Sequence, residues 1–284
     1  MPENAGSSPA IPTSPPLTHL VAGARRQVPD TTTCQHDALQ RETIGDSRER
    51  PAIMRHKRRR QPLKMIKAGY EIIRPNIDDG GAGRDAIYRL IELAGRTCYK
   101  SEDRIKADSA AKFVRALVKN RHEAMLEHAS MTVKFTVDRA VANEIVRHRI
   151  ASYAQESTRY CNYGADKFDG EITVIEPCYL VRETKGWEAW YKACKVAEKM
   201  YFDMLDFGCL PEQARAVLPL STKTELVMTA NMREWRHFLN LRAAGATGRP
   251  HPQMLEVTKP LLGGLKTYMP ELFGDIGGDG DGHA

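Results

Sequence analysis

The chain has 284 residues, a formal net charge of +6 and 27% charged residues. This length suits one domain of moderate size or two small ones, and it allows a sizeable core. No apolar run approaches the roughly 20 residues that cross a bilayer, and no secretory signal pattern opens the chain, so we expect a cytoplasmic protein without membrane contact.

The first 64 residues differ in composition from the rest. They hold 11 Lys or Arg against 6 Asp or Glu, a net charge of +5, and 8 of the 16 prolines but no Phe, Trp or Tyr. Such a segment cannot bury enough apolar surface to offset the entropy of ordering, so we expect residues 1–64 to be a disordered extension. Its basic block at 55–60 is typical of solvated interaction tails. Translation could instead begin at Met65.

Regular structure is predicted from Met65 onward. The segment 65–74 predicts an opening strand that Pro75 closes. Apolar residues at helical spacing then predict two amphipathic helices, one around 87–94 and one around 113–118.

Neither the histidines nor the cysteines show a metal-binding spacing. His122 and His128 are six residues apart, whereas an H-E-x-x-H zinc site places two imidazoles one helical turn apart. The six cysteines are scattered without a C-x-x-C pair, which disfavours a zinc cage or a disulfide framework. We therefore expect no metal.

The clearest strand is 131–137, where apolar and polar residues alternate with a period of two. Asp138 stands where it can cap a short helix, and residues 141–146 supply the buried stripe of that helix. The helix therefore delivers the segment 147–160, RHRIASYAQESTRY, at its end.

The segment 147–160 concentrates cations and hydroxyl groups. Guanidinium groups stay charged and offer five donors in a planar fork, so several of them in one segment suit a phosphate. Cations at a helix end can also merely complement the helix dipole and be solvated. The residues concerned are Arg147, His148, Arg149, Arg159, Ser152, Ser157 and Thr158.

Further elements follow the segment 147–160. Residues 172–175 predict a short strand, and an aromatic stripe from Trp187 onward predicts a long helix up to Gly208 that serves the core or a subunit interface. Residues 222–229 predict a strand, and residues 231–242 predict a helix.

Two of these elements carry further candidate ligand-binding residues. Arg215 lies between small apolar residues, where a buried cation would need an anionic partner; an exposed helical arginine is the alternative. On the helix 231–242, Arg233 and His237 share one face, which is also compatible with a solvent-facing stripe.

These motifs resemble those of the flavin-dependent thymidylate synthases. The segment 147–160 matches the pattern R-H-R-x-x-S-x-N-x-x-S-x-R except that Ala154 replaces the Asn, and the helix 231–242 resembles N-x-R-x-x-x-[HN]-F-x-x-L-R. The resemblance covers residues 65–270. Departures include Glu144, where the family commonly has Gln, and Ala124, where it often has Thr; a carboxylate at Glu144 would repel a phosphate unless an arginine holds it.

The resemblance implies an α+β fold, with a single mixed α/β catalytic domain at 65–273 and a flexible Gly/Asp tail at 274–284. It implies a homotetramer that binds FAD at subunit contacts, without nucleic acid. The implied reaction, in de novo dTMP biosynthesis, is the reductive methylation of dUMP to dTMP with methylenetetrahydrofolate as carbon donor and NADPH as reductant of the flavin.

The resemblance also implies roles for particular residues. Arg242 is the expected catalytic residue, because an arginine beside the uracil carbonyl edge would stabilise the negative charge that develops on the ring. The dUMP-binding residues would be Arg147, Gln155, Glu156, Ser157, Thr158, Arg159, Arg215 and Arg242. The FAD-binding residues would be Arg147, His148, Arg149, Gln155, Asn231, Arg233 and His237.

Other hypotheses stay open at this point. Ser157 has no histidine placed to activate it as a nucleophile, and Cys161 is the rival nucleophile. A basic RNA- or nucleotide-binding module would explain the N-terminal charge; it would bind polyanions with a steep salt dependence and would be colourless.

Overall fold

The computed structural model describes residues 62–75, 77, 79–165, 168 and 170–277. The expected N-terminal extension lies outside the described residues except for its last three positions. The expected C-terminal tail lies outside them beyond residue 277.

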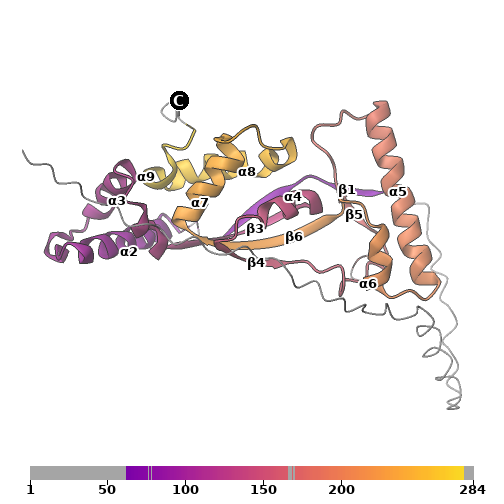
Figure 1. Ribbon diagram of the computed structural model, residues 1–284, viewed down its shortest axis with the longest axis horizontal. Coiled ribbons are helices and arrows are strands. Elements are labelled where there is room, and N and C mark those ends of the chain that lie inside the picture. The colour runs from indigo at the N-terminus through magenta and orange to yellow at the C-terminus, as the bar shows by residue number, and fades with distance from the viewer. Residues whose placement is uncertain (1–61, 76, 78, 166–167, 169, 278–284) are drawn as a thin grey trace, which may run out of the picture. The chain divides into compact units, whose positions relative to one another are not determined.

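A four-stranded antiparallel sheet forms the centre of the fold (Figure 1). Its strand order is β2-β3-β6-β4, with the two long strands in the middle. The predicted alternation of 131–137 is confirmed, because Met131, Val133, Phe135 and Val137 are all fully buried. The strands are β2 (Gly69–Arg74), β3 (Ser130–Asp138), β4 (Ala151–Gln155) and β6 (Lys223–Asn231).

The predicted opening strand is in fact two strands in different sheets. β1 (Lys64–Ile66) pairs in parallel with β5 (Thr173–Ile175), whereas β2 pairs with β3. The chain changes partners at Lys67 and Ala68, and a pairing partner that is distant in sequence leaves no mark in a local pattern.

The helices gather mainly at the two ends of the large sheet (Figure 1). Those predicted from periodicity are confirmed. The two helices predicted around 87–94 and 113–118 extend beyond the predicted stripes, whereas the helix predicted at 231–242 is an α-helix only to Leu239 and continues as a π-helix. The helices are α2 (Ala82–Cys98), α3 (Ser109–Lys119), α4 (Arg139–Ile145), α5 (Lys185–Asp206), α6 (Pro211–Ala214), α7 (Met232–Leu239), α8 (Pro252–Tyr268) and α9 (Pro270–Phe273), with 3₁₀ turns η1 (Glu102–Arg104), η2 (Glu123–His128) and η4 (Arg215–Val217) and a π-helix η5 (Asn240–Ala244).

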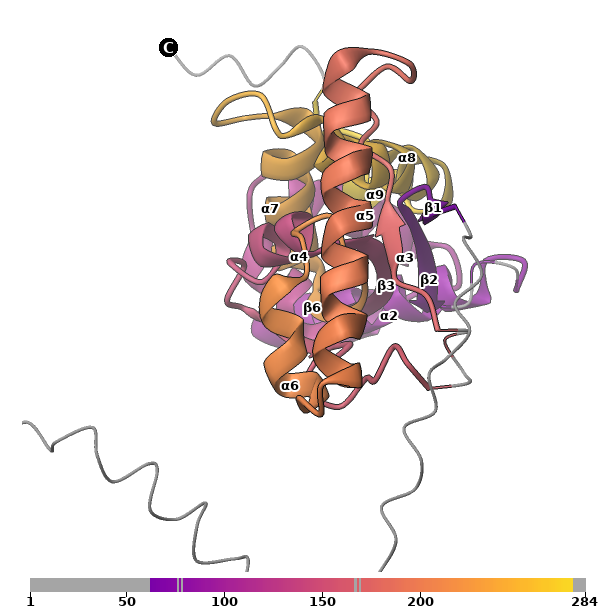
Figure 2. The same ribbon diagram turned by 90° about the vertical axis from the view of Figure 1, so that its right-hand side faces the viewer.

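Two hydrophobic clusters hold these elements together. The larger one joins the four-stranded sheet to α2, α3, α7 and α8, with Trp235 and Phe238 packed on Phe135. The smaller one lies under α5 and includes Tyr201, Phe202 and Ile172. Part of the aromatic stripe of α5 therefore belongs to the core, as predicted, and α5 lies beside α6 (Figure 2).

The ordered domain is slightly longer than 65–273 at both ends. Leu63 is buried, and Lys64 already belongs to β1. At the other end Ile276 is buried, and Asp275 forms an ion pair with Arg236 at 2.7 Å. These contacts draw flanking residues into the fold. In the part of the chain that the structure describes, no helix is long and apolar enough to span a membrane.

Candidate active site

The RHR turn, residues 147–149, is fixed by the elements on either side of it. Asp138 caps α4 as predicted, with its carboxylate accepting from the Val141 amide at 2.6 Å. After the turn, the Tyr153 hydroxyl lies 2.6 Å from the carbonyl oxygen of His148 and 3.0 Å from that of Ile145. This hydroxyl therefore ties the start of β4 to the end of α4.

His148 is the only one of the three RHR residues that is buried. Its Nδ1 lies 3.1 Å from Oε1 of Glu234 on α7, and its Nε2 accepts from Nε of Arg242 at 3.2 Å. The ring also packs edge-on against Phe238. Burial lowers the pKa of His148 and the nearby Arg242 lowers it further, while the hydrogen bond to Glu234 partly opposes them. His148 is therefore neutral near pH 7.

Arg242 lies in the middle of η5. Its Nη1 donates to Oε2 of Glu144 at 3.0 Å, so an arginine does hold the carboxylate that sequence analysis identified as a possible source of repulsion. The Thr258 hydroxyl donates to the Arg242 carbonyl at 2.7 Å. The π-helix η5 ends at Gly245, where a φ of 78° gives the left-handed backbone conformation that favours glycine. Irregular π turns of this kind are frequent at functional sites.

The three FAD-binding candidates on α7 and at its start lie along the first two turns. Asn231 is the N-cap, and its side-chain oxygen accepts from the Glu234 amide at 2.8 Å. Arg233 is exposed and is held by Glu127 at 2.6 Å. His237 is exposed, one turn beyond Arg233, with its ring centroid 5.7 Å from that of His148. The two sequence signatures thus meet in space.

A second group of candidates lies at the other end of β4. The Gln155 amide donates to the Thr224 hydroxyl at 3.3 Å. The Glu156 carboxylate faces inward, where Lys223 binds it at 3.0 Å and the Tyr163 hydroxyl donates to it at 3.2 Å. Burial alone would lower the pKa of Lys223, but the hydrogen bonds to Glu156 and Glu225 outweigh it and raise the pKa.

The remaining dUMP-binding candidates of this group are Arg215 and the three residues that follow Glu156 directly. Thr158 is buried and accepts from Nη1 of Arg215 at 3.5 Å. Arg159 is exposed and pairs with Glu212 at 2.8 Å, while Ser157 accepts from the Arg159 amide at 3.3 Å. Arg215 is itself exposed, so the structure favours the exposed alternative over a buried cation.

The two groups lie at opposite ends of β6. Ala151 pairs with Ala230 near the end of β6 that leads into α7, whereas Gln155 pairs with Leu226 toward the end that follows η4. Four residue steps along β4 correspond to about 13 Å. Figure 1 shows α6 and α7 near opposite ends of β6. Within one chain, Arg215 and Arg242 therefore belong to separate groups at the two ends of β6.

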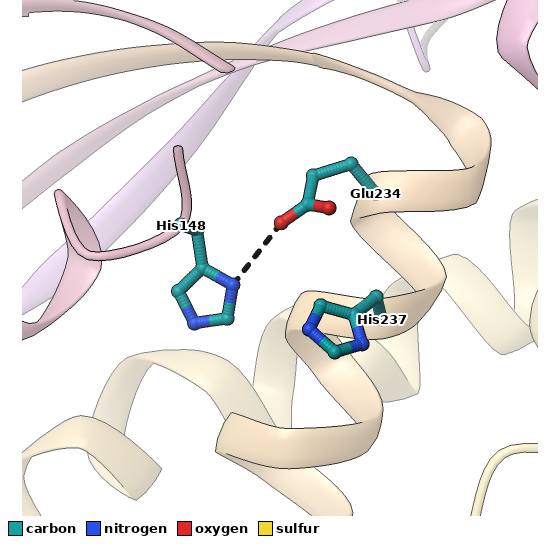
Figure 3. Close-up of side chains that lie close together, drawn as sticks. All are labelled: His148, Glu234 and His237. Carbon is teal, nitrogen blue, oxygen red and sulfur yellow. Dashed lines mark hydrogen bonds and ion pairs between the residues drawn. The ribbon is translucent and has the colours of Figure 1, made fainter. Parts of the chain in front are cut away.

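Among the described residues, one group of three side chains has a composition that could hold a metal ion: His148, Glu234 and His237 (Figure 3). The hydrogen bonds argue against that use. Because Arg242 can only donate, Nε2 of His148 must offer its lone pair and Nδ1 must carry the proton. A metal on Nδ1 would require an imidazolate next to a guanidinium.

Three residues of this site were not among those predicted from the sequence. Glu234, Tyr153 and Thr258 all bind parts of the signature segments. Only Glu234 left a usable signal, because it stands three residues before His237 and therefore near it on the helix. Arg147 and Arg149 are exposed beside His148, while Cys161 is half-buried.

Comparisons with known proteins show the family of this chain. The family model described as "Thymidylate synthase complementing protein" matches residues 85–271. A flavin-dependent thymidylate synthase of Geobacter sulfurreducens is 31% identical over 66% of this chain and 81% of its own, and one of Corynebacterium aurimucosum is 30% identical over 70% of this chain and 83% of its own.

A solved structure is similar as well. It is a UMP/dUMP methylase, PolB of Streptomyces cacaoi, bound with 5-Br dUMP. It shares 26% sequence identity with a TM-score of 0.60, over 75% of this chain and 96% of its own. With the family model matching most of the ordered domain, the chain belongs to the flavin-dependent thymidylate synthase family.

Proposed function

We propose that this chain is a methyltransferase that converts dUMP to dTMP by reductive methylation, with methylenetetrahydrofolate as carbon donor and NADPH as reductant of FAD. One observation carries the proposal beyond family membership. The RHR turn and the α7–η5 segment, 86 positions apart at His148 and Glu234, join in one hydrogen-bonded group that contains Arg242. The relatives' names and the dUMP analogue bound by the methylase support the same substrate.

Arg242 acts on the pyrimidine. Carbon 5 of uracil is a poor nucleophile until negative charge develops on the ring. A guanidinium beside the carbonyl edge stabilises that charge, and it does so most strongly in a site shielded from water. The Arg242 side chain is 25% exposed, so one edge of it is accessible to a ligand while the other is held inside.

The second group binds the rest of the nucleotide. Arg159 and Arg215, together with Arg147 from the first group, hold the 5′-phosphate, since exposed guanidinium groups form strong charge-assisted hydrogen bonds to phosphate oxygens. Residues 155–158 position the sugar and base. Glu156 does so indirectly, because its carboxylate is occupied by Lys223 and Tyr163.

The residues around the RHR turn fit an anionic cofactor. Arg147, Arg149 and His237 are exposed donors near one another in the fold, a suitable set for the pyrophosphate of FAD. Asn231 and Arg233 extend this set along α7. Bound FAD supplies the hydride for the reaction, and the protein supplies the binding groups and their orientation.

We infer a homotetramer whose active sites lie at subunit contacts. The separation of the two groups supports it, because a second copy could bring its Arg215 group to the first copy's Arg242 group. We also infer a cytoplasmic location, where the five described cysteines, all free, would remain reduced.

An absorbance spectrum and a coupled assay test the function. We expect the purified protein to be yellow with bound FAD, to oxidise NADPH faster when dUMP is present, and to form dTMP when methylenetetrahydrofolate is added. A colourless protein that binds RNA with a steep salt dependence, and forms no dTMP, would instead support the nucleic-acid-binding alternative.

A further inference from the structure

The hydrogen bonds around His148 assign a direction to every proton in the group. A guanidinium has five donors and no acceptor, so the contact from Nε of Arg242 requires a lone pair on Nε2 of His148. A neutral imidazole then carries its proton on Nδ1. The Glu234 carboxylate, 3.1 Å away, accepts that proton's hydrogen bond.

The two contacts that anchor Arg242, with His148 at Nε and with Glu144 at Nη1, differ in their exposure to water. The side chains of His148 and Glu234 are 5% and 9% exposed, so water cannot easily replace their mutual hydrogen bond. The Glu144 carboxylate, which binds Nη1 of Arg242, belongs to a side chain that is 38% exposed. The anchor at Nε is therefore permanent, and the anchor at Nη1 is exchangeable.

The backbone of Glu234 is fixed as well. Its amide is bonded to the Asn231 cap at 2.8 Å, in the first turn of α7, where the helix dipole favours a carboxylate. The carbonyl oxygen of His148 is held by the Tyr153 hydroxyl at 2.6 Å. Glu234 thus sits on a helix and the backbone of His148 is held within its turn, so the imidazole has little freedom to move.

We propose that Glu234 and His148 are positioning residues for Arg242. They hold its Nε edge and leave the Nη edge, occupied here by Glu144, for the carbonyl edge of the uracil. The inference rests on the proposed function. Glu234 helps to hold the Nε edge of Arg242 by fixing the tautomer of the His148 imidazole. Without an acceptor at Nδ1, the proton can move to Nε2, and two donors, Nε2–H and the Nε–H of Arg242, would then face each other.

Two substitutions at Glu234 separate this role from a purely electrostatic one. Glu234→Gln keeps an acceptor at Nδ1 and removes the charge, whereas Glu234→Ala removes both. Glu92→Ala is the matched control, because Glu92 is 1% exposed and binds Arg96 and Ser109 away from the site. Its loss lowers stability without touching Arg242.

The expected kinetic result is a split between the variants. For Glu234→Ala, kcat for dTMP formation falls by about 10- to 100-fold, the usual cost of losing a group that orients an acting side chain, while KM for dUMP changes little. Glu234→Gln stays within about threefold of the wild type, and so does Glu92→Ala. Equal losses in the Ala and Gln variants, or none in either, would overturn the proposal.

A spectroscopic readout does not depend on activity. Nitrogen-15 NMR of histidine-labelled protein at neutral pH, with the His148 signals assigned by a His148→Gln variant, reports which ring nitrogen carries the proton. We expect Nδ1–H in the wild type and in Glu234→Gln, and a shift toward Nε2–H in Glu234→Ala if that variant folds. An Nε2–H tautomer in the wild type would refute the inference even in an active enzyme. A wild type that makes no dTMP yet shows Nδ1–H would refute only the proposed function.

Discussion

The two ends of β6 present the same kinds of residue in opposite states. At the end leading into α7, His148 and Glu234 are buried and Arg242 is held on two sides. At the end that follows η4, Arg159 and Arg215 are exposed; Arg159 pairs with Glu212, and Arg215 donates to the buried Thr158. The first group is organised within one chain, whereas the second presents exposed cations, as expected for the shared site proposed above.

This difference has a physical origin in the cost of ordering side chains. An exposed ion pair contributes only about 0–1 kcal/mol, so Arg159 can leave Glu212 and turn toward a ligand. Arg215 is exposed and its hydrogen bond to Thr158 is long, at 3.5 Å, so it can turn in the same way. A buried network is much more rigid, because each unsatisfied group inside would cost about 1–3 kcal/mol. The buried end is thus suited to catalysis, and the exposed end to capture of the phosphate.

The largest effect is expected at the organised end. Arg242→Ala should lower kcat for dTMP formation by about 100- to 1000-fold, because it removes the donor aimed at the developing charge. The fold should persist, since the Arg242 side chain is partly exposed. Arg249→Ala, an exposed arginine in the following loop, serves as the control. Steady-state kinetics with dUMP measures both; a kcat unchanged by Arg242→Ala would remove Arg242 from the chemistry.

A smaller effect of another kind is expected at the open end. Arg215→Ala should raise KM for dUMP by about tenfold with kcat little changed, because a charge-assisted hydrogen bond contributes about 1.5–3 kcal/mol. Arg182→Ala, which breaks an exposed pair with Glu176, should leave KM unaltered. If Arg215→Ala lowered kcat but not KM, the two ends would not differ in the way described.

A still smaller change is expected from weakening the ion pair between Glu144 and Nη1 of Arg242. Glu144→Gln should lower KM for dUMP by about two- to fivefold, because a neutral amide competes less well than a carboxylate for Nη1 of Arg242 and an exposed ion pair contributes about 0.2–1 kcal/mol. Isothermal titration with dUMP gives the same comparison at equilibrium. Weaker binding in this variant would mean that Glu144 helps the substrate instead of yielding to it.

The smallest effect concerns pH and stability. Burial holds the pKa of His148 below its ordinary 6.5, so the folded protein binds this proton less readily than the unfolded chain. The resulting loss of stability begins as the pH falls through about 6.5 and cannot exceed about 1.4 kcal/mol per pH unit. We expect the free energy of unfolding, measured with urea, to fall less steeply from pH 7 to pH 5 for His148→Gln than for the wild type. Equal slopes for the two proteins would contradict the burial effect.

Local patterns in the sequence were sufficient for most elements. The alternation in β3, the Asp138 cap and the stripes of α2, α3, α5 and α7 follow from neighbours within a few residues, and all are present. The split of 65–74 between two sheets was not predictable, because β1 pairs with β5 more than a hundred residues later. For the same reason, the sequence did not predict that Leu63 and Ile276, just outside the expected domain 65–273, are buried.

The candidate site was also predictable only where neighbouring residues carry the signal. The two signatures identified the segments that meet at His148, and the spacing of Asn231, Arg233 and His237 gave their order along α7. The hidden partners Tyr153 and Thr258 could not be read from spacing, since an unremarkable tyrosine or threonine acquires its role only from a distant backbone carbonyl. Nor could the sequence reveal that Arg215 and Arg242 lie at opposite ends of one strand.

Mixing two variants, each impaired at low dUMP concentration, tests whether the two ends meet across subunits. Arg215→Ala and Arg242→Ala chains would be combined under conditions that allow subunit exchange, and dTMP formation at low dUMP concentration would be measured against each variant alone. If each site takes its Arg215 group from one copy and its Arg242 group from another, random exchange should restore about a quarter of the wild-type activity. Assembled mixtures that remain no more active than the separate variants would contradict a site shared between copies.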